Sequence, residues 1–496
     1  MHAILTPDQM RALEQRAFSQ GVSSLLLMED AARAAHQAMA RILGGTAGKR
    51  ILYLVGCGNN GGDGLAMARL CLADGGKPEV LLVGEPCTPD AKTNLAYAQA
   101  LGIPLLKWDP DHAEGMSPPN AVVDAVFGIG FHDSLPPGVA RLAEIVAGWQ
   151  VPVFAVDIPS GMDGLTGEVH GAVFEATHTL ALGHLKLGHC LSPHLDAMGE
   201  LQLVPLAIPQ SAYEALKNVQ LVTALDAADL AKTLPHRPRN AHKGISGRVL
   251  LYMGSWGMAG AAGMAALACL SAGAGLLTIA CEAEIIPVLQ ALAPNAMCLP
   301  IEQAVKSPPP FDVLAVGCGL GRGDRVWENL LVLWQPDKPS VWDADALNLL
   351  AKHQIRLGER AVMTPHPGEA ARLLGCEVRE VTHNPLDAAR RLQEAFGATV
   401  VLKGAASVIQ DASQTSLNII GSPALAKGGS GDALAGIIAG LLAQQPHKPP
   451  FESARTACLW LGTAGQRAAG QYGVHSVLTG DVIACMKEAA VSGFPA

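Results

Sequence analysis

Gly428-Gly429-Ser430-Gly431-Asp432 opens an apolar run that carries no charge through residues 433–440. Glycines can turn their amide groups inward without the steric cost of a Cβ atom. The run behind them predicts a buried helix, whose N-terminus carries free N–H groups and a partial positive charge. Such a corner is suited to a phosphate group or a developing anion, so the sequence predicts a ligand site here.

Asp432 is electrostatically unusual beside a corner that attracts anions. It could act as a general base that accepts a proton from a substrate hydroxyl group. It could also simply cap the helix, a role that short acidic residues fill well. The pentapeptide leaves both interpretations open, and the residues found elsewhere in the chain favour the base.

Composition limits the class of protein. The chain has 496 residues, of which 49% are hydrophobic and 16% charged, which predicts more than one domain with large cores. Its net charge of −9 gives no basic footprint, so we expect no nucleic-acid partner. The 11 cysteines form no CxxC pair, and the N-terminal residues lack the features of a signal peptide. We expect a cytoplasmic protein that forms a homo-oligomer.

One uncharged segment, residues 257–281, is long enough to cross a bilayer. Gly and Ala dominate it, and it lacks both a strongly apolar composition and a basic flank. We therefore expect a buried helix packed closely against a sheet, and no membrane association.

Short β-rich runs alternate with helical stretches in both halves of the chain, which predicts α/β domains with parallel sheets. In the first half, the strands are expected at residues 50–55, 79–83, 121–126 and 152–157, with helical spacing over residues 6–43 and 65–72. In the second half, they are expected at residues 248–252, 276–280, 312–316, 361–363 and 399–402. The proline-bearing stretch 205–242 separates the series, so we expect domains at residues 1–215 and 222–496.

The first predicted strand is followed by a glycine-rich motif at residues 56–64. Its first six residues satisfy GxGxxG, and Glu85 lies near the end of the next strand, so an ordinary dinucleotide-binding Rossmann domain is one interpretation. The motif also contains polar side chains that GxGxxG does not include, at Asn59, Asn60 and Asp63, and pyrophosphate binding alone does not require them. These side chains could hold hydroxyl groups, an amide or a cation.

Two more polar loops follow later strands of the first half. Asp124 and residues 128–134 come after one strand, and Asp157, Ser160 and Asp163 come after another. Asp124 and Asp157 could each cap a turn. Ligands in open α/β sheets bind at the carboxyl ends of strands, so three such loops predict a common site. Oxygen atoms of Asn, Asp and Ser side chains could also bind a hard cation.

The motif at 56–64, together with Asp-Ile-Pro-Ser-Gly at 157–161, resembles the NAD(P)H-hydrate epimerase domain, whose members interconvert the epimers of hydrated NADH and NADPH (NADHX and NADPHX). The resemblance implies a Rossmann-like fold and a potassium ion near Asn60, Asp124 and Ser160. It implies Asp157 as a catalytic residue. The implied substrate contacts are Asn59, Asn60, Gly61, Gly62, Asp63, Gly128, Ile129, Gly130, Phe131, His132, Asp133, Ser134 and Asp157.

Further motifs in the second half surround Asp432. Lys403 and the amides after it could hold nucleotide phosphates, although a solvated lysine at a strand end is the alternative. His366 and Glu369 share a proline-fixed turn, where His366 could equally be structural. Glycines at 317–323 allow close approach of a ligand, and the carboxylates of Asp343 and Asp345 could be structural or linked to a metal-bound phosphate.

The segments Thr-Pro-His-Pro-Gly-Glu (364–369), Lys-Gly (403–404) and Gly-Gly-Ser-Gly-Asp (428–432) resemble the ribokinase-like superfamily, and within it the ADP/ATP-dependent NAD(P)H-hydrate dehydratases. Both halves in one chain resemble the bifunctional NAD(P)H-hydrate repair enzymes. The resemblance implies ADP with Mg²⁺, and a catalytic Asp432. Implied hydrate contacts are Gly321, His366 and Asp432, and implied nucleotide contacts are Lys403, Gly404, Ala405, Ala406, Ser407 and Gly431.

The dehydratase chemistry that this resemblance implies is a kinase reaction with a different outcome. Asp432 would accept the proton of the hydrate's ring hydroxyl, which takes a phosphoryl group from ADP, and loss of phosphate would restore the dihydropyridine. A small-alcohol kinase fused to a Rossmann-like module is the alternative. A non-catalytic first half is disfavoured, because a scaffold has no need of Asn59, Asn60, Asp63 and Asp157 together.

Overall fold

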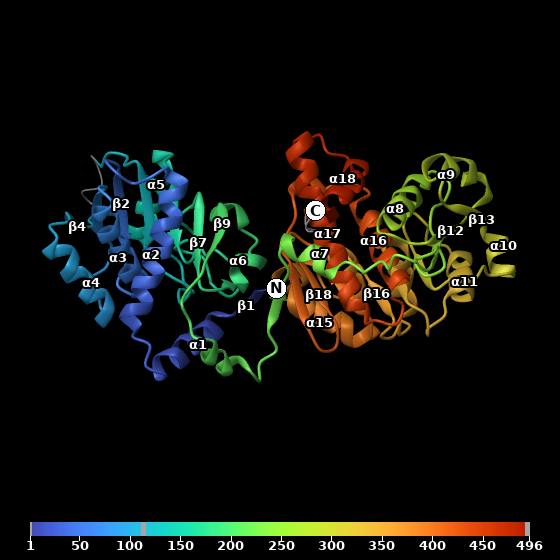
Figure 1. Cartoon of the computed structure of the whole chain (residues 1–496), viewed down its shortest axis with the longest axis horizontal. Helices are drawn as coiled ribbons and strands as arrows, with labels where there is room; N and C mark the ends of the chain where they lie inside the picture. The colour runs from blue at the N-terminus through green and yellow to red at the C-terminus, as the bar shows by residue number, and fades with distance from the viewer. Residues whose placement is uncertain (1, 111–115, 492–496) are drawn as a thin grey trace. The chain divides into compact units, whose positions relative to one another are not determined.

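The computed structural model describes residues 2–110 and 116–491 and divides into two compact units. The N-terminal unit is Ala3–Leu221, and the C-terminal unit runs from Val222 onward and includes His2. Both are α/β units with mainly parallel sheets (Figure 1). The predicted fold class, two successive α/β units, is confirmed.

The sheet of the N-terminal unit is parallel throughout, and its strand order reverses at β2 as in a doubly wound fold. The order is β4 (Leu105–Lys107), β3 (Lys77–Leu82), β2 (Arg50–Val55), β5 (Ala121–Ala125), β6 (Val153–Val156), β7 (His178–Leu182) and β9 (Glu200–Val204). Both faces are covered, because Tyr53 packs with α2 (Ser24–Leu43) and α3 (Asn59–Ala73), whereas Leu54 packs with α5 (Pro137–Trp149). Burial on both faces explains why these strands are continuous apolar runs.

A smaller cluster in the same unit places α1 (Pro7–Ser19). Thr6 caps this helix in a capping box with Gln9. Leu13 and Ala17 of α1 pack against Ala212 and Leu216 of the short helix η3 (Gln210–Leu216). This packing holds the remaining face of α1 beside the carboxyl ends of the strands.

The sheet of the C-terminal unit begins with seven parallel strands, the next strand is antiparallel to them, and the following strand and β10 (Val222–Ala224) run parallel to the first seven. The order is β13 (Met297–Pro300), β12 (Leu276–Cys281), β11 (Arg248–Tyr252), β14 (Val313–Val316), β15 (Ser340–Trp342), β16 (Ala361–Met363), β17 (Thr399–Leu402), β18 (Ser407–Gln410), β19 (Thr415–Asn418) and β10.

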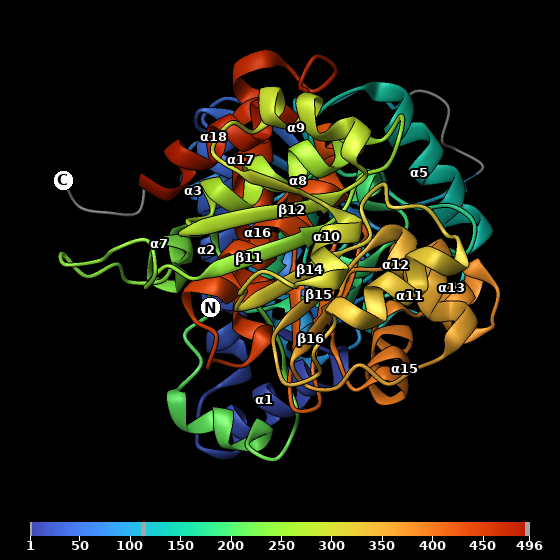
Figure 2. The same ribbon diagram turned by 90° about the vertical axis from the view of Figure 1, so that its right-hand side faces the viewer.

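Helices cover both faces of this second sheet (Figure 2). Four share a core with Leu251 and Val341: α8 (Ala259–Ser271), α16 (Ser430–Gln444), α17 (Pro450–Tyr472) and α18 (Thr479–Val491). On the other face, the ring of Trp327 in α11 (Asp324–Leu333) packs edge-on against Trp342, with 6.4 Å between the ring centroids. The same ring stacks on His353 of α12 (Ala344–His353). α16 is thereby buried along most of its length, as its apolar sequence predicts.

Some expected elements differ from the structure. The stretch 6–43 forms two helices, α1 and α2, and the segment 257–281 contains α8 followed by β12, so it is not a single helix. The helix expected at 65–72 begins at Asn59, so most of the glycine-rich motif is its first turns. Among the described residues, no helix is both long and apolar enough to cross a membrane.

Candidate active sites

A cavity of about 560 Å³ lies in the N-terminal unit, beside the ends of β2, β5 and β6. α1 and α2 contribute the other side of its lining. The predicted site residues that line it are Asn59, Asn60, Asp63, Gly128, Ile129, Gly130, Phe131 and Asp157. Three loops far apart in the sequence therefore meet in one cavity at the carboxyl edge of the sheet, as expected for this topology.

The start of α3 brings the glycine-rich motif into the cavity. A Cβ atom on Gly61 would lie 2.1 Å from the carbonyl oxygen of Gly56, so only glycine lets the first turn of α3 approach β2 so closely. No side chain caps α3, whose N-cap residue is Gly58. Its first N–H groups therefore remain available to a ligand, and Asn59 and Asn60 flank them.

Asp157 adopts a left-handed conformation, with φ of 67°, that is uncommon for a residue other than glycine. The buried Lys186 ammonium donates to Oδ1 of Asp157 at 2.6 Å and to the carbonyl of Leu182 at 2.7 Å. His189 Nε2 donates to the Asp157 carbonyl at 2.8 Å, and its Nδ1 accepts from the Lys186 amide. Burial, with the Lys186 charge, lowers the pKa of His189 to about 4, so this imidazole is neutral.

Asp124 is fully buried, and its carboxylate accepts hydrogen bonds from Ser160 Oγ at 2.6 Å, Ser160 N at 2.7 Å and Val126 N at 3.2 Å. Burial raises its pKa to about 6. Within the described residues it makes no ion pair, and the nearby motif residue Asn60 has a buried amide nitrogen without a hydrogen-bond partner. A buried carboxylate that lacks a cationic partner suits a bound cation.

Five other predicted contacts lie outside the lining of this cavity: Gly61, Gly62, His132, Asp133 and Ser134. His132 Nδ1 is paired with Asp163 Oδ2 at 2.7 Å, and Asp133 and Ser134 are exposed. Asp163 also accepts from the amides of Leu165 and Thr166, so it holds its own loop together.

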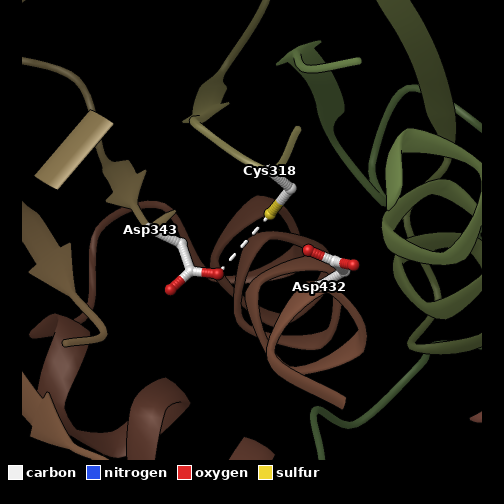
Figure 3. Close-up of side chains that lie close together, drawn as sticks. All are labelled: Cys318, Asp343 and Asp432. Carbon is white, nitrogen blue, oxygen red and sulfur yellow. Dashed lines mark hydrogen bonds between the residues drawn. The ribbon is translucent and has the colours of Figure 1, made fainter. Parts of the chain in front are cut away.

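In the C-terminal unit, Asp432 is the third residue of α16, whose N-cap residue is Gly429. Gly429 has φ of 97°, and no side chain caps this helix, so Asp432 is not its cap. Burial raises the pKa of the Asp432 carboxyl, which makes it a stronger base than an exposed aspartate. Figure 3 shows that Asp432, Asp343 and Cys318 converge, and their ligand atoms lie within 4.8 Å of one another.

Lys403 follows β17 and lies inside this group. Its ammonium donates to Oδ1 of the buried Asp343 at 2.8 Å and lies 4.0 Å from Glu369. Burial alone would raise the pKa of Asp343, but Lys403 and the Thr364 hydroxyl hold it below its usual range. The alternative of a solvated lysine is therefore wrong, because the side chain is only 22% exposed and is paired.

His366 has a structural role in this fold. Its Nδ1 accepts from the Gly368 amide, and its own amide donates to Glu369, which forms a capping box at the start of α13 (Pro367–Leu374). Burial and the Lys403 charge lower the pKa of His366, and about half of its side chain remains exposed.

The loops beside these residues carry the other predicted contacts. The Gly321 amide donates to Asp345 at 2.9 Å, and Arg322 donates to the same carboxylate. Asp345 thus holds the glycine loop, whereas Asp343 belongs to the group around Asp432. Gly404, Ala405 and Ala406 form the turn between β17 and β18, with Lys403 at its start, and Ser407 is the first residue of β18.

Three residues at these sites were not predicted from the sequence: Lys186 and Glu14 in the N-terminal cavity, and Cys318 beside Asp432. Lys186 carried a signal, since it is a charged residue inside the apolar stretch 179–187. Glu14 carried none, because a glutamate on an amphipathic helix is ordinarily a solvated side chain.

Comparisons with known proteins agree with both halves. A family model described as NAD(P)H-hydrate dehydratase matches residues 249–488, and one described as YjeF-related protein N-terminus matches residues 24–188. The bifunctional NAD(P)H-hydrate repair enzyme Nnr of Moorella thermoacetica is 35% identical over 509 residues, covering 97% of this chain and 95% of the relative. The enzyme of the same name from Escherichia coli is 36% identical, covering 88% and 84%.

One solved structure is an ADP/ATP-dependent NAD(P)H-hydrate dehydratase from Bacillus subtilis, co-crystallised with ATP and Mg²⁺. It is 28% identical with a TM-score of 0.50, covering 55% of this chain and 99% of that one. The chain therefore belongs to the family of bifunctional NAD(P)H-hydrate repair enzymes. It is an enzyme with an epimerase half and a dehydratase half, and the small-alcohol kinase is not favoured.

Proposed function

We propose that the cavity of the N-terminal unit interconverts the R and S epimers of NADHX and NADPHX without a nucleotide. The hydrate would lie between the first turn of α3 and residues 128–131, with Asp157 at the reacting ring. The strained Asp157, paired with Lys186, is the observation that supports this role, because a carboxylate that lines the cavity can stabilise a cationic ring.

In the C-terminal unit, we propose that Asp432 is the base that accepts the proton of the ring hydroxyl of the S hydrate. The hydroxyl oxygen takes the terminal phosphoryl group of ADP, and AMP is the leaving group. The ring nitrogen then expels phosphate and forms a carbon–nitrogen double bond, and loss of a proton from the neighbouring ring carbon restores NADH or NADPH. The carrying observation is the uncapped start of α16, where the amides of residues 429–431 can stabilise the transferring group beside Asp432.

Lys403 and residues 404–407 are proposed to hold the phosphates of ADP, with Gly321 and His366 against the hydrate. The group Cys318, Asp343 and Asp432 does not form a closed Mg²⁺ cage, since a thiol is a poor Mg²⁺ ligand and Asp343 is paired with Lys403. The carboxylates could still bind a Mg²⁺ ion that arrives with the nucleotide, because such an ion needs only one or two protein carboxylates besides the phosphates.

The product of the nucleotide reaction separates the dehydratase from an alcohol kinase. With S-NADHX and ADP, we expect inorganic phosphate and NADH to form in equal amounts, because the phosphate ester collapses as the ring nitrogen pushes it out. Phosphorus NMR of the reaction identifies the products. A phosphate ester that accumulates without NADH would show that the chain is a kinase.

We also propose a potassium ion at Asp124, Ser160 and Asn60, on the strength of the unpaired buried carboxylate described above. The ion would neutralise that charge and orient the start of α3. No step of the chemistry passes through it.

Asp124→Asn should weaken potassium binding by about 10- to 150-fold, the effect of losing one charge-assisted contact. The readout is the rise in melting temperature with added KCl, compared with NaCl, alongside epimer exchange. Because burial raises the pKa of Asp124 to about 6, wild-type potassium stabilisation should disappear as the pH falls through that value. An unchanged potassium response in Asp124→Asn would place the ion elsewhere.

A further inference from the structure

Charged side chains in the epimerase cavity are unevenly paired. The acidic residues in its lining are Glu14, Asp63, Asp90 and Asp157, and the basic residues are Arg11 and Lys186. Lys186 is committed to Asp157, and Arg11 donates to Asp8 on its own helix. The cavity therefore holds more carboxyl groups than its cations neutralise.

Glu14 differs from two buried acids of this unit, Asp124 and Asp157, whose carboxylates have partners. It lies on α1 directly after Leu13, which packs in the core with Leu216, and it is half-buried in the cavity lining. Within the described residues, no hydrogen bond or ion pair holds its carboxyl group. By contrast, Asp124 accepts three hydrogen bonds, and Asp157 pairs with the ammonium of Lys186. A carboxyl group that lines the cavity and has no protein partner is free to contact a ligand there.

The chemistry of the proposed epimerase needs a proton carrier at this place. The stereocentre of the hydrate is the ring carbon that carries the hydroxyl group and is bonded to the ring nitrogen. Its configuration is lost when the carbon–oxygen bond breaks and the nitrogen lone pair forms a carbon–nitrogen double bond. Hydroxide is a poor leaving group, so the oxygen must receive a proton as it departs.

Resting on the epimerase function proposed above, we propose that Glu14 is the catalytic acid–base residue of this cavity. Its carboxyl proton passes to the hydroxyl oxygen, and water leaves as the carbon–nitrogen double bond forms. Water then adds to the other face of the ring and returns one proton to the Glu14 carboxylate. The cycle consumes no oxidant, reductant or nucleotide, and the negative Asp157 stabilises the cationic ring between the two steps.

The electrostatics of the cavity suit Glu14 to this exchange. Burial, reinforced by the Asp157 charge and opposed by Lys186 and Arg11, raises the pKa of Glu14 to about 7. A group that titrates near neutral pH can both give and take a proton. Burial, with the charges of Asp157, Glu14 and Asp90, also raises the pKa of Asp63 well above its usual range.

The test uses the full chain and compares Glu14→Gln with Glu14→Asp and with Glu144→Gln. Glu144 lies on α5, pairs with Arg141 at 3.0 Å and is outside the cavity. Epimer ratios are followed by chromatography from pure R-NADHX without nucleotide. We expect Glu14→Gln to lower the exchange rate by about 100- to 10,000-fold, Glu14→Asp to recover part of it, and Glu144→Gln to match the wild type. Dehydration of S-NADHX should be unchanged in all three.

The pH profile distinguishes proton transfer from a structural role. Wild-type exchange should fall as the pH rises through about 7, because Glu14 loses the proton that it donates. This decline should be absent from the residual rate of Glu14→Gln. Because folding keeps Glu14 protonated above its unfolded pKa, removing the charge should also leave the protein at least as stable above pH 7.

Two results would overturn the inference: near-normal exchange by Glu14→Gln, or a slow variant whose rate still declines through pH 7. If the wild type fails to exchange the epimers, the epimerase assignment itself fails. If the wild type and Glu14→Gln exchange the epimers equally fast, the epimerase assignment stands and only the role of Glu14 fails.

Discussion

Asp432→Asn should lower the rate of S-NADHX dehydration by about 100- to 10,000-fold while epimer exchange continues at the wild-type rate. Asparagine has nearly the same size as aspartate, but it cannot accept the proton of the ring hydroxyl. Because no side chain caps α16 and Gly429 is its N-cap residue, the substitution removes no cap. Recovery of the dihydronicotinamide absorbance measures dehydration directly.

Asp481→Asn provides a matched control in the same unit. Asp481 is the third residue of α18, as Asp432 is of α16, and a glycine precedes each of them. Unlike Asp432, Asp481 accepts a hydrogen bond from the amide of Leu478, at 2.8 Å, ahead of the helix. We expect this control to lose some stability and keep dehydration. Near-normal dehydration by Asp432→Asn would remove the aspartate from the mechanism.

Lys403→Ala should have two separate effects, on ADP binding and on folding. Losing a charge-assisted contact to phosphate should weaken ADP binding by about 10- to 150-fold. Removing one partner of a buried ion pair leaves Asp343 uncompensated, which typically costs about 3–5 kcal/mol of stability. Calorimetric titration with ADP and chemical denaturation measure the two effects independently.

A double variant, Lys403→Met with Asp343→Asn, separates these contributions. It removes both charges of the pair, so stability should largely return, while ADP binding should stay weak. If the double variant instead binds ADP like the wild type, Lys403 serves only to neutralise Asp343. Hydrate binding provides the reference, because Lys403→Ala should affect it far less than ADP binding.

Strand positions were predictable where strands are short, continuous apolar runs. β2, β11, β16 and β17 lie where the sequence places them, because burial on both faces leaves little room for polar residues. Helix starts were harder to predict. The glycines of the motif at 56–64 suggested a loop, yet close packing of Gly61 against Gly56 draws most of the motif into α3.

The site motifs could be found from local patterns, but their pairings could not. Asp343 and Lys403 are 60 positions apart in the sequence. They meet because Asp343 follows β15 and Lys403 follows β17, and these two strands flank β16 in the sheet. Lys186 reaches Asp157 from β8 (Leu185–Lys186), which is positioned by pairing with Ile4 and Leu5 near the start of the chain. Such long-range contacts leave no local spacing that a single sequence reveals.

Pure R-NADHX incubated with the full chain, ADP and Mg²⁺ tests the two-site account most directly. The R epimer must first be converted in the N-terminal cavity before the C-terminal site can act on it. We predict full recovery of the dihydronicotinamide absorbance by the wild type. Asp432→Asn should accumulate S-NADHX without recovery. Absorbance that returns only from the S epimer, or not at all, would contradict the account.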